Sequence, residues 1–131
     1  MTVAFCTYCS ALKSKAAGSI PAIQRYQSSR IERTYEAANL LGIEFYILSG
    51  EYGLLRPSEP IPWYDHLLVP DEVSSLVPII VSQMKDFQIH HLLFMTRSMV
   101  QFPELVPYHD TIRAASEQAR IALSIVEIGN V

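Results

Sequence analysis

The sequence lacks long hydrophobic runs. None of its apolar segments reaches the roughly 18 residues that a helix needs to cross a bilayer, although half of its residues are hydrophobic. No basic leader precedes the first apolar segment, so no secretory signal is visible. We therefore expect a cytoplasmic protein that has no membrane partner.

The glycine motifs that hold common cofactors are also missing. The five glycines form neither Gly-x-Gly-x-x-Gly nor a Walker loop, which argues against dinucleotide and P-loop nucleotide binding. Gly-x-Ser-x-Gly is absent as well, which argues against an α/β-hydrolase nucleophile. The sequence implies no cofactor.

Cysteine is scarce, with only Cys6 and Cys9 in a Cys-x-x-Cys arrangement. No second pair exists, and the four histidines show no metal-binding spacing, so we expect no metal site. A thioredoxin-like redox motif is a weaker hypothesis, in which residues 11–15 would open a helix. The simpler interpretation makes Cys6 a buried strand residue and Cys9 a loop residue.

Excess basic charge is absent too. The net charge of −3 argues against a protein that coats DNA. Residues 1–50 nevertheless hold five basic and three acidic side chains, whereas the remainder holds five and ten. The N-terminal part could therefore form a local basic patch that suits a phosphate, or simply a solvated surface.

The pattern of apolar segments predicts an α/β fold. A length of 131 residues is typical of one domain, here 1–131, with a sizeable core. Strands and helices alternate, and the strand 43–48 is apolar on both faces apart from Glu44, which favours a central strand of a parallel sheet. We therefore expect a three-layer, Rossmann-like sandwich with a mainly parallel sheet of about four strands. Expected strands cover residues 2–6, 43–48, 90–95 and 124–128, and expected helices cover 22–26, 30–41, about 70–84 and 110–122.

Particular residues mark helix boundaries. Ser28 or Ser29 is suited to cap the helix 30–41, and Gly42 to end it. Pro78 lies inside an apolar helical stripe, so we expect a kink or a restart there.

One long segment, residues 49–69, separates the second strand from the next helix. Structureless loops beyond about 12–15 residues are uncommon in compact domains unless they are functional or disordered. This one carries too many apolar and aromatic side chains to remain solvated. We interpret it as an ordered loop that lies over the mouth of a site.

Three polar loops follow strands: Ser10 to Lys15, Ser49 to Asp65, and Thr96 to Ser98. In open α/β sheets, ligands bind outside the carboxyl ends of the strands. If the strands are parallel, these loops converge at one edge, where we expect the site.

Several side chains in these loops suit chemistry. Asp65, beside aromatic residues, could lose hydration and act as general base or stabilise an oxocarbenium-like sugar. Tyr52 and Tyr64 could stack on a base or bond to a sugar. The Ser49 hydroxyl and the Gly50 amide could bind a phosphate or oxyanion. The alternatives are a loop-locking aspartate, core tyrosines and a plain Ser-Gly turn.

A second group comes from the N-terminal part. Lys13 could pair with a phosphate or with Asp65, and Ser10, Tyr26 and Ser28 could join it in binding substrate. A solvent-facing lysine and a helix-capping Ser28 are the competing interpretations.

Together these residues carry a family resemblance. Cys9-Ser10-x-x-Lys13, Tyr26-x-Ser28, Ile47-Leu48-Ser49-Gly50-x-Tyr52-Gly53-Leu54-Leu55-x-Pro57 and Tyr64-Asp65 resemble an uncharacterised bacterial and phage domain family. The central stretch is also similar to that of the YaaA peroxide-stress proteins. Trp63 stands where the family usually has Pro, and Gly50 replaces Ala. The resemblance implies an α/β core, a link to DNA or nucleobase chemistry, and a binding role for the motif glycine Gly53.

Two functions follow as hypotheses. The first is an enzyme that acts on a nucleoside, nucleotide or nucleobase, cleaving or transferring at an N-glycosidic bond, with Asp65 and Tyr52 as catalytic residues. The second is a non-catalytic DNA-binding or stress-response module that uses the same mouth. A redox protein based on Cys6 and Cys9 is a third, weaker reading.

Overall fold

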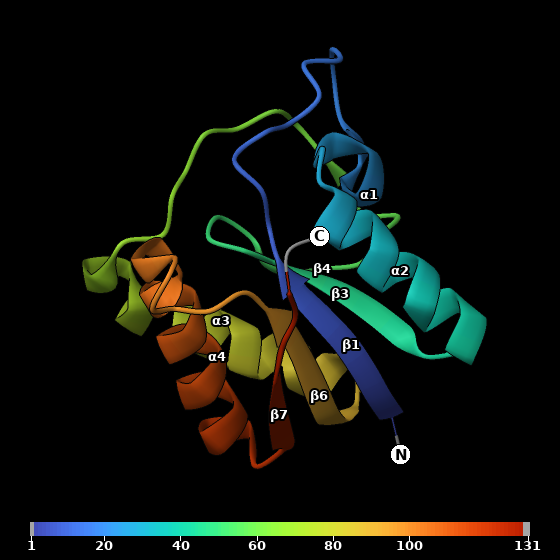
Figure 1. Cartoon of the computed structure of the whole chain (residues 1–131). Coiled ribbons are helices and arrows are strands. Elements are labelled where there is room, and N and C mark those ends of the chain that lie inside the picture. The colour runs from blue at the N-terminus through green and yellow to red at the C-terminus, as the bar shows by residue number, and fades with distance from the viewer. Residues whose placement is uncertain (1, 130–131) are drawn as a thin grey trace.

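The structure, a computed structural model, describes residues 2–129 (Figure 1). Its strands are β1 (Thr2–Tyr8), β2 (Ile20–Pro21), β3 (Glu44–Ser49), β4 (Gly53–Leu55), β5 (Pro60–Ile61), β6 (Ile89–Thr96) and β7 (Ala122–Glu127). Its α-helices are α1 (Ala22–Arg25), α2 (Ser29–Leu41), α3 (Val73–Asp86) and α4 (Val106–Ala119), with 3₁₀ turns at Pro70–Glu72 and Pro103–Leu105.

Five strands form the central sheet in the order β4-β3-β1-β6-β7. All neighbours are parallel except β4, which runs antiparallel to β3. The predicted α/β fold with a mainly parallel sheet is therefore confirmed. The fifth strand, β4, comes from the segment that we expected to be a loop.

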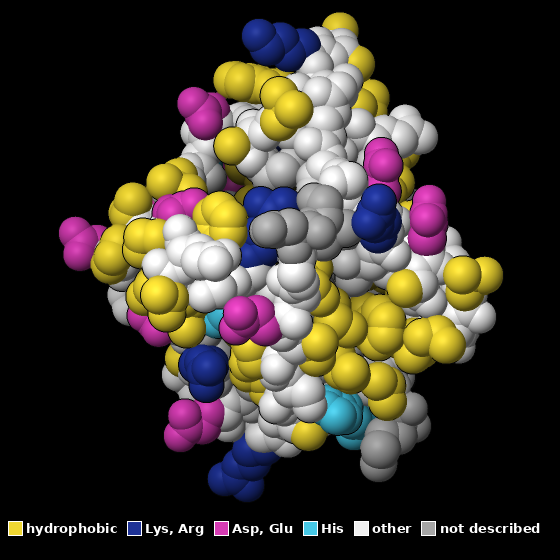
Figure 2. All heavy atoms as spheres, viewed as in Figure 1, with side chains coloured by type: hydrophobic (Ala, Val, Ile, Leu, Met, Phe, Trp, Pro, Cys, Tyr) yellow, Lys and Arg dark blue, Asp and Glu magenta, His cyan; other side chains and the backbone are white. Residues whose placement is uncertain are grey.

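Helices cover both faces of the sheet (Figure 1). Helix α2 packs on β1 and β3, while α3 and α4 pack together against the opposite face. Leu93 and Met95 of β6 are only partly buried on the side that bears α2, because that helix does not reach β6 and β7. Figure 2 shows apolar side chains gathered on this open face.

The termini of α2 follow from two residues. The Ser28 side chain accepts a hydrogen bond from the backbone N–H of Ile31 at 3.3 Å, which satisfies one of the free donors of the first turn. Gly42 adopts the left-handed conformation, with φ 68°, that commonly ends a helix. Both predictions are confirmed, with Ser28 rather than Ser29 as the cap.

Pro78 does not divide its helix. Helix α3 runs without a break from Val73 to Asp86, so the predicted restart is wrong. The carbonyl that loses its partner belongs to Ser74, which is exposed and can bond to water instead. The buried stripe Leu76, Ile80 and Met84 continues through the proline.

The last helix and strand begin earlier than predicted. Pro107 lies at the second position of α4, where its missing N–H costs nothing, although the predicted helix 110–122 left it outside. Arg120 then ends the helix with φ 58°. Helix 110–122 is therefore corrected to 106–119, and strand 124–128 to 122–127.

The segment 49–69 is ordered by pairing with the N-terminal part of the chain. β5 pairs with β2, and the buried Arg25 donates hydrogen bonds to the carbonyls of Ser14, Ala16, Gly18 and Ile61. Five bonds use all five N–H groups of the guanidinium. Arg25 thus ties loop 9–19 to the chain around β5.

Within residues 2–129, no helix combines the length and the apolar character that crossing a membrane requires.

Candidate functional site

A cavity of about 490 Å³ lies at the carboxyl ends of β1 and β6. The chain passes from β1 to β3 on one side and then crosses to β6 on the other, so the strand order reverses between β1 and β6. Such a switch point is the usual ligand site of open α/β sheets. The walls come from the loop after β1, the start of α2, residues 65–67, Arg97, and Phe102, Glu104, Leu105 and Tyr108.

Arg30 forms the floor of the cavity between β1 and α2. Its side chain is 3% exposed, and its guanidinium carbon lies 3.5 Å from the ring centroid of Tyr8. It donates to the Thr7 hydroxyl, to the Tyr8 carbonyl at 2.7 Å and to the Cys9 carbonyl at 3.2 Å. Burial lowers the pKa of Arg30 to about 10, which still leaves the group charged at neutral pH.

Lys13 lies in the wall of the cavity and is 7% exposed. Its ammonium nitrogen is 4.5 Å from the ring centroid of Tyr64 and 5.8 Å from that of Tyr26. Its only hydrogen bond to a described residue is a long one, 3.5 Å, to the Ala11 carbonyl. Neither Lys13 nor Arg30 forms an ion pair within residues 2–129.

Behind Lys13, three hydroxyl groups form a chain. Ser49 Oγ accepts the backbone N–H groups of Glu51 and Tyr52, both at 3.1 Å. Because both of its acceptor sites are then occupied, its own hydrogen is directed to the Tyr64 oxygen at 2.8 Å. Tyr64 in turn bonds to Tyr26. Burial raises the pKa of both tyrosines, so their hydroxyls stay protonated.

Six of the predicted site residues lie outside the cavity lining: the three members of the hydroxyl chain, and Tyr52, Gly50 and Gly53. Tyr52 packs its ring edge-on to Tyr64, with centroids 5.3 Å apart. A Cβ on Gly50 would lie 3.0 Å from the Cβ of Leu68, so this glycine permits close packing of the loop. Gly53 has φ 76° and faces Gln83, so it serves the turn into β4.

Ser10, Ser28 and Asp65 do line the cavity together with Lys13. Asp65 is exposed, so the expectation that aromatic neighbours would remove its hydration is wrong. The chain turns outward here, and the adjacent Trp63 is itself 50% exposed. The Asp65 carboxylate therefore lies at the rim of the cavity, in contact with water.

His66, next in the chain, joins the loop to the rest of the fold. Nδ1 bonds to Glu51, and Nε2 lies 2.7 Å from a carboxylate oxygen of Glu72. A neutral imidazole has only one N–H, so both contacts need the protonated ring. The hydrogen bonds to Glu72 and Glu51 accordingly raise the pKa of His66.

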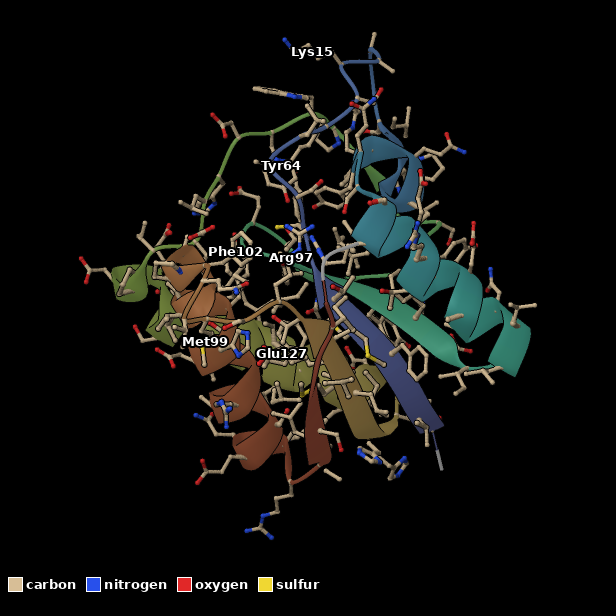
Figure 3. All side chains as sticks on the ribbon, in the orientation of Figure 1. Lys15, Tyr64, Arg97, Met99, Phe102 and Glu127 are labelled. Atoms are coloured by element: carbon tan, nitrogen blue, oxygen red, sulfur yellow. The ribbon has the colours of Figure 1, made fainter. Side chains whose placement is uncertain are left out.

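Sequence reasoning missed most of the aromatic wall. Tyr8, Phe102 and Tyr108 line the cavity, and the Arg97 guanidinium lies 5.3 Å from the Phe102 ring centroid (Figure 3). Lys15, which we counted in the basic N-terminal part, lies instead at the outer tip of its loop, away from Arg97. No local motif identifies Phe102 or Tyr108, because they reach the cavity from the far end of the chain.

The two cysteines do not form a redox motif of the expected shape. Both are free, Cys6 is buried in β1, and residues 11–15 form no helix. Burial raises the pKa of the Cys6 thiol, which suppresses the nucleophilic thiolate. Residues 2–129 contain no cluster of three or more His, Cys, Asp or Glu side chains that could hold a metal ion.

No family model, curated protein or solved structure matches the chain. The resemblance to the YaaA peroxide-stress proteins therefore stays a prediction that rests on the motif residues.

Proposed function

We propose that the protein is an enzyme that acts on a nucleoside, nucleotide or nucleobase, cleaving or transferring at an N-glycosidic bond. The observation that carries the proposal is the composition of the cavity at the switch point. Aromatic rings and the buried cations Lys13 and Arg30, which lack an ion-pair partner within residues 2–129, line one space of about 490 Å³. This volume lies in the range of small-molecule sites.

The two kinds of lining suit the two parts of a nucleotide. The Phe102 ring, which is only partly buried, offers a surface against which a base can stack, and the buried Tyr8 and Tyr108 rings line the cavity beside it. Lys13 and Arg30 supply positive charge for phosphate oxygens. The sugar would then lie between them, close to the rim that carries Asp65.

Asp65 is the carboxylate that we assign to the chemistry. From the rim it can accept a proton from an attacking water or sugar hydroxyl, or stabilise positive charge on the sugar ring. Tyr52, which we expected to be catalytic, contacts Tyr64 rather than the cavity. In the proposal it is a positioning residue for Tyr64 and Lys13.

The alternative function is a non-catalytic DNA-binding or stress-response module. Exposed apolar side chains favour it, because Leu12 is 65%, Trp63 50% and Leu67 57% exposed on the two loops near the cavity. Such side chains can contact a partner larger than a nucleotide. The affinity of this module for DNA would fall steeply with salt as counterions are released.

A thermal-shift screen separates the two functions. Nucleosides, nucleotides and free bases are added to the wild type and to Asp65→Asn, and stabilised pairs are then assayed for released base. A ligand at 100 times its Kd should add about 2.7 kcal/mol of stability. The enzyme hypothesis predicts that both proteins are stabilised and that only the wild type turns over. No stabilisation by any of these compounds would contradict it.

A further inference from the structure

We propose that Arg30 and the N-terminus of α2 form the receptor for a phosphate monoester, so that the ligand is a nucleoside monophosphate rather than a nucleoside. This inference rests on the proposed function and names the substrate class of the same cavity. It assigns the anion to the start of α2 and not to the Ser49-Gly50 turn, both of whose residues are buried away from the cavity.

Two hydrogen-bond donors of the Arg30 guanidinium have no acceptor within residues 2–129. Its three hydrogen bonds within residues 2–129 use both N–H groups of Nη1 and one of Nη2. A guanidinium has five, so the Nε–H and one Nη2–H have no protein partner there. The side chain is almost completely buried, yet it lines the cavity. A group that has been desolvated without an anion is costly, and an anion in the cavity would offset that cost.

The start of α2 adds backbone donors at the same place. Ser28 Oγ takes the N–H of Ile31, which leaves the N–H groups of Ser29 and Arg30 in the first turn without an intrahelical partner. Ser28 and Ser29 line the cavity beside Arg30. The dipole of this 13-residue helix places further positive charge there.

Charge balance favours a monoester over a diester. Lys13, Arg30 and Arg97 bring positive charge to the lining, and His66 is paired with Glu51 and Glu72. The carboxylates in the lining, Asp65 and Glu104, are both exposed. A phosphate monoester carries about −1.5 to −2 at neutral pH, whereas a diester carries a single negative charge. A terminal phosphate also leaves one end of the ligand free to lie against Arg30.

Calorimetric titration of the wild type tests the assignment. The probes are the four ribonucleosides and their 5′-monophosphates. A third set of probes consists of the same monophosphates with a methyl ester on the phosphate. We expect at least one monophosphate to bind about tenfold or more tightly than its nucleoside, with the methyl ester in between. Equal affinity for a nucleoside and its monophosphate would overturn the receptor while leaving the proposed function intact. Binding of none of the probes would overturn both.

A matched pair of variants tests whether the preference for monophosphate depends on Arg30. Arg30→Lys keeps the charge but loses the planar fork, and Arg33→Lys makes the same change at an exposed position one turn along α2. We expect Arg30→Lys to lose most of the preference for monophosphate and to retain nucleoside binding, with Arg33→Lys unchanged. A folded Arg30→Lys with the full preference would contradict the role of Arg30. If Arg30→Lys does not fold, the comparison of monophosphate with methyl ester in the wild type decides.

Discussion

The ammonium group of Lys13 lies over the ring of Tyr64, 4.5 Å from its centroid. The Tyr64 hydroxyl is held by Ser49, whose remaining bonds are to the backbone of the β3–β4 turn. The position of a cavity cation therefore depends on a serine that lies outside the cavity lining. This relationship connects the Leu-Ser-Gly-x-Tyr-Gly stretch to the site without requiring it to touch a ligand.

Removing the Tyr64 hydroxyl should destabilise the fold. In Tyr64→Phe, the Ser49 hydroxyl loses the acceptor toward which its other bonds direct it, which should cost about 1–3 kcal/mol. Urea denaturation measures the change. Tyr35→Phe is the control, because the Tyr35 ring packs on Phe45 at 5.5 Å between centroids and should lose less than about 0.5 kcal/mol. Equal stability of the two variants would contradict the hydroxyl chain.

Arg25→Lys should be more damaging. Lysine cannot replace five hydrogen bonds to the carbonyls of Ser14, Ala16, Gly18 and Ile61, and breaking this buried set should cost about 3 kcal/mol or more. The same denaturation experiment with Arg33→Lys, which changes an exposed arginine, should show little loss. An Arg25→Lys variant as stable as that control would show that the two loops are held by other contacts.

Substitution of two glycines by alanine should distinguish destabilisation by backbone strain from destabilisation by steric crowding. Gly18 and Gly53 have φ of 75° and 76°, but a Cβ on Gly18 meets nothing within 4 Å, whereas one on Gly53 would collide with Gln83. Gly18→Ala should cost about 1–2 kcal/mol from the left-handed backbone alone. Gly53→Ala should cost clearly more, because Gln83 also bonds to the N–H and the carbonyl of Leu54. Unfolding free energies of the two variants test the difference.

The bonds of His66 should make stability depend on pH in two directions. Its folded pKa is raised by Glu72 and Glu51, so this stabilisation is present below the unfolded value of about 6.5 and is lost as pH rises through the folded pKa. The pKa of Glu72 is lowered by His66, so its part is present above the ordinary value and is lost as pH falls. The melting temperature, measured as a function of pH, should therefore fall both above the folded pKa of His66 and below the ordinary pKa of Glu72.

His66→Gln should remove this pH dependence, while His90→Gln, a change at an exposed histidine, should preserve it. If both variants kept the wild-type dependence of melting temperature on pH, the bonds of His66 to Glu51 and Glu72 would not be its cause.

The sequence predicted those parts of the fold that local patterns determine. Apolar runs identified the strands, and Ser28 and Gly42 identified the ends of α2. Local patterns did not reveal β4, because Gly53–Leu55 becomes a strand only by pairing with β3. Pro78 and Pro107 misled us, because the effect of a proline depends on its distance from the helix start and on solvent access.

The site residues that lie close to strand ends or helix starts were also predicted from local patterns, and the others were missed. Ser10, Lys13, Ser28 and Asp65 follow strands or begin a helix, and the topology brings them to one cavity. Arg30 gave no signal of its own, since its importance comes from burial against the end of β1. Phe102 and Tyr108 were missed because they are distant in the sequence from every motif residue.

The most direct test of the account is calorimetric titration of nucleosides and their 5′-monophosphates into the wild type and into Ala11→Trp. Ala11 is an exposed residue of the cavity lining, so the larger side chain should fill the cavity and leave the core intact. We predict that the wild type binds at least one of these compounds and that Ala11→Trp binds it at least tenfold more weakly. Unchanged binding in the folded variant, or no binding by the wild type, would contradict the assignment of the cavity.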